Sequence, residues 1–360
     1  MRKKVAVAIS GGVDSSAAAW LLREDGHDVI GVTMWLGIPT AEGRPVEHCV
    51  PKEIEDARRV CQKLGIPHYI LDFAGDLDVK VIRPFIAEYL QGRTPNPCVE
   101  CNRTIKFGTL LRKVRAMGCE YLATGHYARV DHDHVTSRLR VPRDVRKDQT
   151  YFLYAMGKEE LRHVLFPLAD YQKDEVRKLV AAVQLPTSEK PESQDICFIP
   201  RDGIEPFIKD RAGESILPGD IVNHEGRVLG RHRGLPFYTI GQRGGLGISN
   251  PVPLYVLALD VTGNRLIVGE KHEVRATGLV ADHLNLLVER PPERAAAKIR
   301  YAHRAAPCDM IWEDTYLTVR FDQPQEAITP GQSVVVYDGD VVVGGGIIRE
   351  AIKINYGEFI

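Results

Sequence analysis

The segment Ser10-Gly11-Gly12-Val13-Asp14-Ser15-Ser16 lies between a short apolar run at residues 5–9 and a stretch rich in Ala and Leu. The apolar run predicts a buried strand, and residues 17–22 predict the helix that follows it. Glycines at such a junction let the backbone approach a ligand, and the first N–H groups of the helix attract an anion. The Asp14 carboxylate would repel phosphate unless a divalent cation lies between them. Residues 10–16 therefore predict a nucleotide loop that uses Mg²⁺.

Up to about residue 185, short strand-like runs alternate with amphipathic helical stretches. Further strands are expected at residues 29–34, 68–73 and 120–125. One helix is expected to place Ile54, Ala57, Cys61 and Leu64 on its apolar face, and a later one Val176, Leu179, Val180 and Val183. This alternation predicts an α/β fold with a doubly wound parallel sheet. No Walker A motif occurs and no GxGxxG follows the first strand, so a dinucleotide-binding Rossmann site is not expected.

The second half of the chain is richer in Gly, Pro and strand-like runs. We expect three domains: a nucleotide-binding catalytic domain at residues 1–200, a central β-rich domain at 201–272 and a C-terminal antiparallel β-barrel at 273–360. Leu317, Val319 and Phe321 alternate with polar residues, as in a strand with one buried face. The pair Asp338-Gly339 lies between two β-branched runs and predicts a hairpin turn.

The bulk composition narrows the class of protein. The chain has 360 residues, of which 44% are hydrophobic and 26% charged, as in an ordinary globular protein. The apolar run near the N-terminus is too short for a signal peptide or membrane span, and seven cysteines do not resemble a secreted disulfide framework. A cytoplasmic location is therefore expected. The net charge of −1 leaves nucleic-acid binding open, because the basic run from Arg138 to Lys147 is either a local patch or a solvated face.

Two thiols, Cys98 and Cys101, are three residues apart on what the neighbouring prolines predict to be a loop. In a cytosolic chain this spacing suggests metal binding or redox chemistry. A structural zinc site needs about four ligands, but the sequence has no second CxxC, and Cys197 is the remaining candidate. Cys61, Cys119 and Cys308 are expected to be buried, and Cys49 has no assignable partner. Positive charge near Cys101 would help to keep it a thiolate.

Six motifs together resemble one enzyme family. They are SGGVDSS, GRTPNPCVECNRTIKFG, ATGHYAR, KDQTYFL, ESQDICFIP and YTIGQRGGLGI, in this order. They look like the motifs of the bacterial tRNA-specific 2-thiouridylases, which belong to the PP-loop ATP pyrophosphatase superfamily. The resemblance implies an adenine-nucleotide hydrolase-like fold and ATP-dependent 2-thiolation of the wobble uridine of tRNA. It also implies a persulfide-donating partner, either a cysteine desulfurase or a sulfur-relay protein.

The resemblance also assigns roles to individual residues. ATP binding falls to Ala8, Ile9, Ser10, Gly11, Gly12, Val13, Asp14, Ser15, Met34 and Gly125. Asn96, Pro97 and Cys98 match the segment that meets the target base, Cys101 matches the catalytic nucleophile, and Cys197 matches the cysteine that carries the persulfide. Contacts with tRNA fall to His126, Lys147, Asp148, Gln149, Arg300, Tyr301 and Gln332.

One residue departs from the family pattern, because many members have Asp at the position of Cys98. If Cys98, Cys101 and Cys197 converge, they would suit an iron–sulfur cluster with one open iron. A disulfide relay between Cys101 and Cys197 is the rival mechanism. Two other functions stay open: a PP-loop ligase that adenylates a small-molecule carbonyl for attack by an amine, and a non-catalytic RNA-binding protein with a structural metal.

Overall fold

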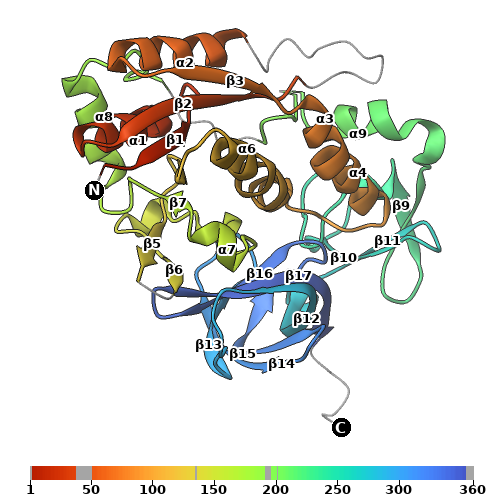
Figure 1. Cartoon of the computed structure of the whole chain (residues 1–360). Coiled ribbons are helices and arrows are strands. Elements are labelled where there is room, and N and C mark those ends of the chain that lie inside the picture. The colour runs from red at the N-terminus through yellow and green to blue at the C-terminus, as the bar shows by residue number, and fades with distance from the viewer. Residues whose placement is uncertain (1, 38–50, 134–135, 191–195, 201, 354–360) are drawn as a thin grey trace. The chain divides into compact units, whose positions relative to one another are not determined.

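The computed structural model describes residues 2–37, 51–133, 136–190, 196–200 and 202–353 (Figure 1). Contacts within the chain divide it into two compact units, which are described separately. The first unit comprises residues 1–81, 97–198 and 340–342, and the second comprises 82–96, 199–339 and 343–360. Cys49, for which the sequence offered no partner, lies outside the described residues.

The first unit is built on a five-stranded parallel sheet. Its strands are β1 (Lys4–Ala8), β2 (Asp28–Trp35), β3 (His68–Asp72), β4 (Tyr121–Ala123) and β7 (Val164–Leu165). Their spatial order is β3-β2-β1-β4-β7. All four predicted strands and the doubly wound class are confirmed, although β4 is shorter than expected.

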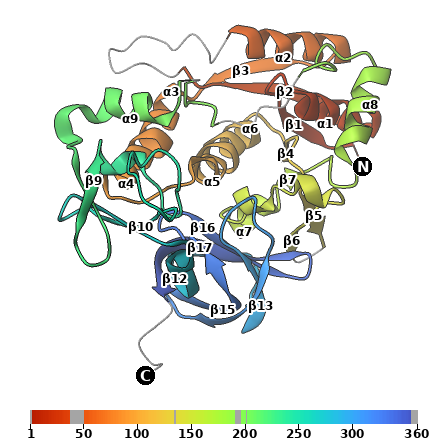
Figure 2. The same ribbon diagram turned by 180° about the vertical axis from the view of Figure 1, so that it is seen from behind.

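Helices cover both faces of this sheet (Figures 1 and 2). On one face, α1 (Val13–Glu24), α2 (Pro51–Leu64) and α8 (Lys173–Ala182) pack into one apolar cluster. Strands β2 and β3 are added on one side of β1, and the chain then crosses to the other side of β1 to form β4. Because such connections are right-handed, the helix α6 (Leu111–Ala116) lies on the opposite face, against β4. The predicted helix faces are confirmed, because Ala57 and Cys61 of α2 and Val176 and Val180 of α8 are buried.

The segment that carries Cys98 and Cys101 is helical, and the prediction that it forms a loop was wrong. Here α5 (Pro97–Cys101) runs directly into the π-helix η2 (Asn102–Leu110) and then into α6. Proline is compatible with the first turn of a helix, because the N–H that it lacks would have no intrahelical partner there. Pro97 therefore begins the helix, and residues three apart on it share one face.

Shorter elements complete the first unit. They are α3 (Ala74–Leu77), η1 (Asp78–Ile82), β5 (Arg129–His132), β6 (Ser137–Arg140), η3 (Val145–Lys147), η4 (Thr150–Phe152) and α7 (Lys158–Leu161). Strands β5 and β6 pair antiparallel.

The second unit begins with the helices α4 (Arg83–Leu90) and α9 (Ile204–Ala212). The strand-like texture of the second half of the chain did not predict α9. Phe207 and Ile208 are buried on α9, and Pro206 falls in its first turn, where it does not break the helix. A four-stranded sheet follows in the order β10-β11-β8-β9. The strands of this sheet are β8 (Gly219–Val222), β9 (Val228–His232), β10 (Tyr255–Asp260) and β11 (Arg265–Gly269). The short helices around it are η5 (Gly213–Ser215), η6 (Leu235–Phe237) and η7 (Lys271–Val274).

The predicted C-terminal barrel is confirmed. Its strands follow the order β12-β15-β14-β13-β16-β17, and a further pairing of β12 with β17 closes the sheet on itself. Leu317, Val319 and Phe321 are buried in its core, as their alternation predicted. The strands are β12 (Arg275–Leu286), β13 (Arg294–Lys298), β14 (Ala306–Trp312), β15 (Leu317–Glu326), β16 (Ser333–Asp338) and β17 (Val341–Lys353).

The predicted hairpin turn lies one residue later than expected. Strand β16 ends at Asp338, so the two turn residues are Gly339 and Asp340. Gly339 has a φ of +61°, and a first turn position with positive φ suits a glycine.

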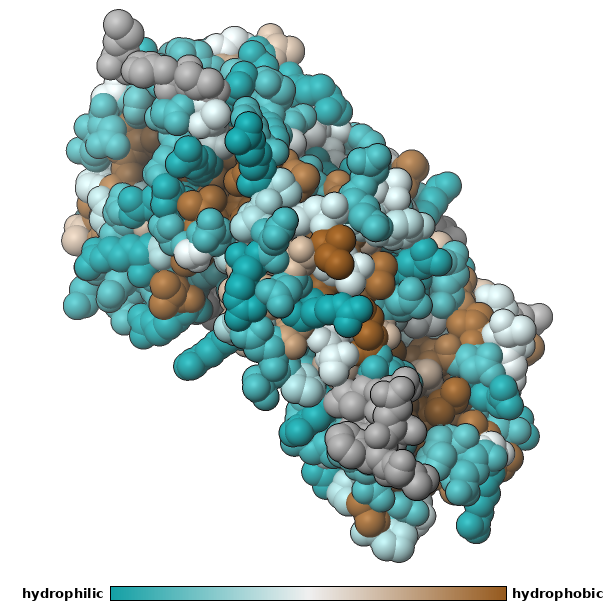
Figure 3. All heavy atoms as spheres, turned by 90° about the horizontal axis from the view of Figure 1, so that it is seen from below, coloured by the Kyte–Doolittle hydropathy of each residue, from teal (hydrophilic) through white to brown (hydrophobic). Residues whose placement is uncertain are grey.

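The surface drawn in Figure 3 is mostly hydrophilic, with hydrophobic residues in smaller groups between the polar ones. Within the described ranges, no helix combines the length and the apolar character that crossing a membrane requires.

Candidate active site

The nucleotide loop, residues 10–16, lies at the carboxyl end of β1. This strand is the point where the order of the sheet reverses, with β2 on one side and β4 on the other. Loops that follow adjacent strands diverge at such a point and leave a crevice, where open α/β sheets bind their ligands. Gly125 and His126 follow β4 at the same edge, and Met34 lies near the carboxyl end of β2. The fold thus brings the predicted ATP-binding residues to one edge of the sheet.

Backbone geometry in the loop depends on its glycines. Gly11 has a φ of +71°, and a methyl group there would lie 2.5 Å from the carbonyl oxygen of Glu53 in α2. Gly12 is the N-cap of α1 and has no side chain to occupy the first N–H groups of that helix. The Ser15 hydroxyl accepts a bond from the Ser10 N–H at 3.2 Å, and the Ser16 hydroxyl donates to the Gly12 carbonyl at 2.7 Å. These contacts fix the loop around an uncapped helix end that suits an anion.

The Asp14 carboxylate is held by two side chains that the sequence did not single out. The Lys173 ammonium, at the start of α8, lies 2.6 and 2.7 Å from its two oxygens. The Tyr127 hydroxyl donates to Oδ1 at 2.9 Å. Lys173 is buried, whereas the Asp14 side chain is 32% exposed. Tyr127 belongs to the ATGHYAR motif, but no motif marks Lys173, which lies 159 positions from Asp14.

A second lysine, Lys190, contacts the N-terminal part of the nucleotide loop. The Lys190 ammonium donates to the Gly11 carbonyl at 3.0 Å and forms an ion pair with Asp56 of α2. The buried Thr187 hydroxyl donates to the Ser16 hydroxyl at 3.0 Å. The segment just before the ESQDICFIP motif is therefore bound to the nucleotide loop, although the sequence carried no signal for these contacts.

A glycine is required at position 125 because the backbone there passes very close to the backbone of the nucleotide loop. A methyl group there would lie 2.6 Å from both the Asp14 carbonyl carbon and the Ser15 nitrogen. Contacts this short between non-bonded heavy atoms are strongly repulsive, so a side chain would push the two segments apart. The resemblance assigned Gly125 to ATP binding, and this packing gives a physical reason for a glycine beside the loop.

The thiols of Cys98 and Cys101 are half-buried on α5. Burial raises the pKa of both thiols, while the Lys106 ammonium acts in the opposite direction. Lys106 lies five residues after Cys101, and the i→i+5 spacing of a π-helix brings such residues together. The expected positive charge near Cys101 is therefore present, but burial outweighs it and favours the thiol.

Cys197 lies in the same unit and is exposed. Across the described residues, no three or more His, Cys, Asp and Glu side chains are gathered so that they could hold a metal ion. Cys98, Cys101 and Cys197 are thus not arranged as a metal site in this structure. Cys61, Cys119 and Cys308 are buried, as predicted.

His126 packs against two aromatic rings, which also contact each other. Its centroid lies 6.0 Å from that of Phe107 and 6.1 Å from that of Phe166. Nδ1 shares a hydrogen bond of 2.7 Å with the Thr124 hydroxyl. Burial lowers the pKa of His126 well below its ordinary value, and the Lys106 charge lowers it further. The imidazole is therefore neutral at physiological pH.

The Lys147-Asp148-Gln149 segment is bonded to the protein itself, beginning with the Lys147 N–H, which donates to the Asp144 carbonyl at 3.0 Å. Asp148 is buried and accepts bonds from the Thr150 N–H at 2.9 Å and the Thr150 hydroxyl at 2.5 Å. The Gln149 side-chain oxygen accepts from the Tyr127 N–H at 2.9 Å. This segment therefore helps to position Tyr127, which in turn contacts Asp14.

Neighbouring arginines of the basic run are paired with carboxylates. Arg140 contacts Asp131 and Asp340, Arg143 contacts Glu175, and Arg146 contacts Asp144. Part of the run's positive charge is therefore balanced locally.

The remaining predicted residues lie in the second unit. The Arg300 guanidinium donates to the carbonyl groups of Glu326 and Ala327, whereas Tyr301 is 39% exposed. The Gln332 amide donates to the Thr94 carbonyl at 2.8 Å. The Thr94 N–H donates to the Pro330 carbonyl at 2.9 Å. Gln332 thus holds the backbone two residues before Asn96, the first residue of the predicted base-binding segment.

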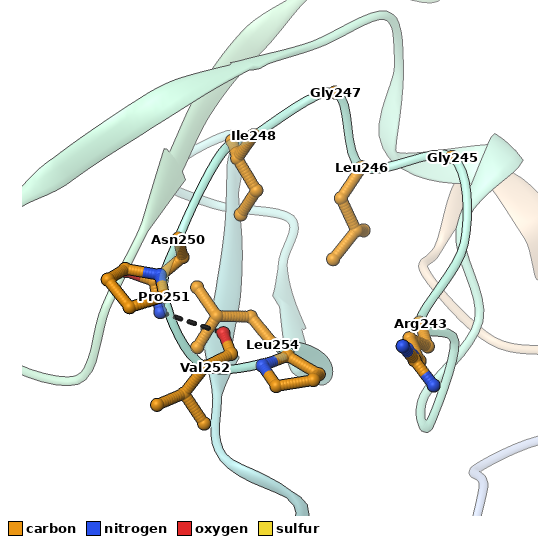
Figure 4. Close-up of a pocket in the computed structure, with 10 residues that line it drawn as sticks. Arg243, Gly245, Leu246, Gly247, Ile248, Asn250, Pro251, Val252 and Leu254 are labelled. Carbon is orange, nitrogen blue, oxygen red and sulfur yellow. Dashed lines mark hydrogen bonds between the residues drawn. The ribbon is translucent and has the colours of Figure 1, made fainter.

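The YTIGQRGGLGI motif contributes to a cavity of about 320 Å³ in the second unit (Figure 4). Arg243, Leu246, Ile248 and Leu254 are among its lining residues, and the Asn250 side chain donates to the Val252 carbonyl at 2.9 Å. None of the predicted site residues lines this cavity.

Models of known families match consecutive parts of the chain. Residues 3–201 match a tRNA methyl transferase HUP domain, residues 205–270 a tRNA methyl transferase PRC-barrel domain, and residues 276–348 an aminomethyltransferase beta-barrel domain.

Curated relatives match almost the whole chain. The tRNA-specific 2-thiouridylase MnmA 1 of Syntrophus aciditrophicus is 52% identical over 98% of this chain and 94% of that protein. The MnmA proteins of Symbiobacterium thermophilum and Carboxydothermus hydrogenoformans are 49% and 47% identical over 98% of this chain, and over 93% and 99% of their own lengths. The domain descriptions mention methyl transferases, but identity over the full length is the stronger indication. The chain therefore belongs to the family of tRNA-specific 2-thiouridylases.

Proposed function

We propose that the protein uses ATP to replace the 2-carbonyl oxygen of the wobble uridine of tRNA with sulfur. The main support for this proposal is that the nucleotide loop and the pair Cys98 and Cys101 lie in the same unit. The chain that contains them belongs to the thiouridylase family. Membership of that family also supports tRNA as the substrate. We propose a cytoplasmic location, where tRNA and ATP are both available.

The nucleotide loop would bind ATP through Ala8 to Ser15, with Met34 and Gly125 beside it. The free N–H groups at the start of α1 suit the phosphates. Mg²⁺ fits the donors at this edge, because it needs only one or two carboxylates in addition to phosphate oxygens, and Asp14 offers a partly exposed carboxylate. When bound, Mg²⁺ would neutralise charge on the departing pyrophosphate.

Adenylation makes the uracil oxygen a leaving group. The 2-carbonyl oxygen attacks the α-phosphorus of ATP, the bond from that phosphorus to the bridging oxygen breaks, and pyrophosphate leaves. The product carries AMP on the former carbonyl oxygen. Asn96, Pro97 and Cys98 would hold the base, which must leave its stack in the anticodon to reach this position.

Sulfur would then arrive through two cysteines. A partner protein loads Cys197 with a persulfide, whose terminal sulfur attacks C2 of the activated uridine so that AMP leaves. Cys101 attacks the Sγ of Cys197 and breaks the sulfur–sulfur bond, which leaves sulfur on C2 and a Cys101–Cys197 disulfide. Alternatively, Cys101 attacks first, and the sulfide that it releases attacks C2. A thiol reductant must open the disulfide after each turnover.

An iron–sulfur cluster on Cys98, Cys101 and Cys197 is the alternative to this relay. It would explain why this chain has a third thiol where many relatives have Asp. In that case Cys98→Ala loses both iron and activity. Full activity of Cys98→Ala in iron-free protein supports the relay instead.

We propose tRNA contacts at His126, Lys147, Asp148, Gln149, Arg300, Tyr301 and Gln332. A neutral His126 would act as a hydrogen-bonding or stacking group, and the exposed Tyr301 ring can stack on a base. We also propose domain boundaries at residues 200 and 272, and the ends of the three family-model matches support them.

The test is to incubate the protein with tRNA, Mg·ATP and a persulfide donor, and to score AMP and 2-thiouridine together. Asp14→Ala should lose AMP formation while tRNA binding persists. Cys197→Ser should still form AMP with tRNA but should make no 2-thiouridine from the persulfide donor. AMP formation that does not depend on tRNA, and that requires an added amine, would favour the small-molecule ligase. Failure to bind ATP would favour the RNA-binding protein.

A further inference from the structure

Lys173 is a buried lysine that the proposed mechanism does not use. Its side chain is 7% exposed, and its ammonium contacts both oxygens of Asp14 at 2.6 and 2.7 Å. The same ammonium lies 5.6 Å from the centre of the Tyr127 ring. Lysine is almost never buried to this extent unless its charge is paired. The partner that the structure provides is the one carboxylate within the nucleotide loop.

The backbone of Lys173 is fixed independently of this ion pair. Gln172 and Glu175 form a reciprocal capping box at the start of α8. The Lys173 N–H donates to the buried Asp144 carboxylate at 3.0 Å. The Asp144 carboxylate also accepts from the Arg146 N–H at 3.2 Å. The helix therefore presents the ammonium to Asp14 from an anchored position.

The charge of Asp14 matters because the loop has to accept a polyanion. An unpaired carboxylate beside the triphosphate would repel it, and this repulsion is strong where few water molecules screen it. Mg²⁺ can offset the repulsion only while it is bound. An ammonium bound to the carboxylate offsets it in the empty loop as well.

We propose that Lys173 is a charge-compensating, positioning residue of the nucleotide loop, which neutralises Asp14 and competes with Mg²⁺ for that carboxylate. The inference rests on the proposed function in one respect, that residues 10–16 bind ATP. It has a consequence that a purely structural ion pair would not have. Removing the ammonium should weaken the binding of metal-free ATP far more than the binding of Mg·ATP.

The experiment measures the equilibrium dissociation constant of ATP by calorimetry, once with excess EDTA and once with Mg²⁺. Four proteins form a double-mutant cycle: the wild type, Lys173→Met, Asp14→Asn and the double variant. Lys178→Met is the matched control, because Lys178 is exposed on the same helix. Circular dichroism establishes that each variant is folded. The double variant contains no unpaired charge at this pair, so it keeps the test valid if Lys173→Met is unstable.

In EDTA, Lys173→Met should bind ATP about tenfold more weakly than the wild type, since one uncompensated negative charge faces the phosphates. Asp14→Asn should bind ATP more tightly than the wild type, because Lys173 is then left with an unopposed positive charge. The double variant should return to nearly the wild-type value. With Mg²⁺ present, the deficit of Lys173→Met should shrink markedly, since the cation takes over the carboxylate.

Equal ATP affinities of Lys173→Met and the wild type in EDTA would overturn the proposal. So would weaker binding by Asp14→Asn than by the wild type, or a double variant as poor as Lys173→Met. Lys178→Met should match the wild type under both conditions. If the wild type itself binds no ATP with or without Mg²⁺, the proposed function has failed instead, and the two failures are thereby distinguished.

Discussion

At the scale of single residues, two opposing influences set the state of the Cys101 thiol. Burial raises its pKa, and the Lys106 ammonium lowers it. Lys106→Met should therefore raise the pKa of both Cys98 and Cys101 further. At pH 8 we expect iodoacetamide to alkylate Cys101 roughly several-fold more slowly than in the wild type, because a smaller fraction of the thiol is ionised. Mass spectrometry of the Cys101 peptide over time would measure this rate.

The control for this experiment is Lys63→Met, a change on the exposed side of α2 that should leave the alkylation rate unchanged. In the wild type the rate should keep rising with pH beyond about 8.5, because the pKa of the thiol lies above its ordinary value. A plateau near neutral pH would mean that the thiolate already exists, contrary to the effect of burial.

The half-buried imidazole of His126 should make the protein less stable in acid. Its pKa is lowered in the folded state by burial and by the Lys106 charge. The unfolded chain takes up a proton near pH 6.5 and the folded protein does not, so stability should fall as the pH drops below about 6.5. His126→Gln should reduce that loss by up to about 1.4 kcal/mol per pH unit, the limit for one proton. Urea unfolding at several pH values would measure both slopes, and identical slopes would contradict the prediction.

At the scale of elements, the connection after β4 has to pass very close to the start of α1. Gly125→Ala would introduce a methyl group 2.6 Å from the Asp14 and Ser15 backbone. Overpacking of this kind typically costs about 1–3 kcal/mol. If the strain moves the nucleotide loop, ATP affinity should fall by about tenfold or more. Calorimetric titration with Mg·ATP would measure the change, and unfolding by urea would measure the lost stability.

Gly75→Ala is the matched control for that substitution. Gly75 lies in α3, and a methyl group there would meet no heavy atom within 4 Å. It should leave both ATP affinity and stability nearly unchanged, since alanine is a better helix former than glycine. Wild-type ATP affinity in Gly125→Ala would show that the loop tolerates displacement.

At the scale of the whole molecule, a net charge of −1 means that tRNA must be attracted by local groups of cations. Binding should therefore weaken with salt, with a log–log slope of roughly 0.7–0.9 for each phosphate neutralised. Lys147→Ala should reduce that slope by about one unit. Filter binding of tRNA between about 50 and 200 mM salt would measure it. Lys178→Ala, on the exposed side of α8, should not change the slope, and an unchanged slope in Lys147→Ala would remove Lys147 from the RNA contact surface.

The fold class could be predicted from the amino-acid sequence, because the features that specify it are local. Apolar runs and helical periodicity placed the strands β1 to β4 and the helices α1, α2 and α8, and alternation identified the barrel strand that contains Leu317. The short strands β5, β6 and β7 were not predicted. Burial of Cys61 followed from its place on an apolar helix face, and burial of Cys119 and Cys308 from the general tendency of cysteine to be buried. The error at Cys98 and Cys101 also has a local cause. The prolines that indicated a loop there include Pro97, which falls in the first turn of a helix, where a missing N–H costs little.

The groups that surround the nucleotide loop could not be predicted in this way, because folding brings them together from distant positions. Asp14 could be identified from its motif, but its partner Lys173 lies 159 positions away and begins a helix whose pattern indicates only an apolar face. Lys190 reaches Gly11 across 179 positions. The pKa of Cys101 likewise depends on burial, which no local pattern reveals. Periodicity in the sequence indicates which face of a segment is buried in the core. Ion pairs and desolvation depend instead on which other segments pack against that segment in the folded chain.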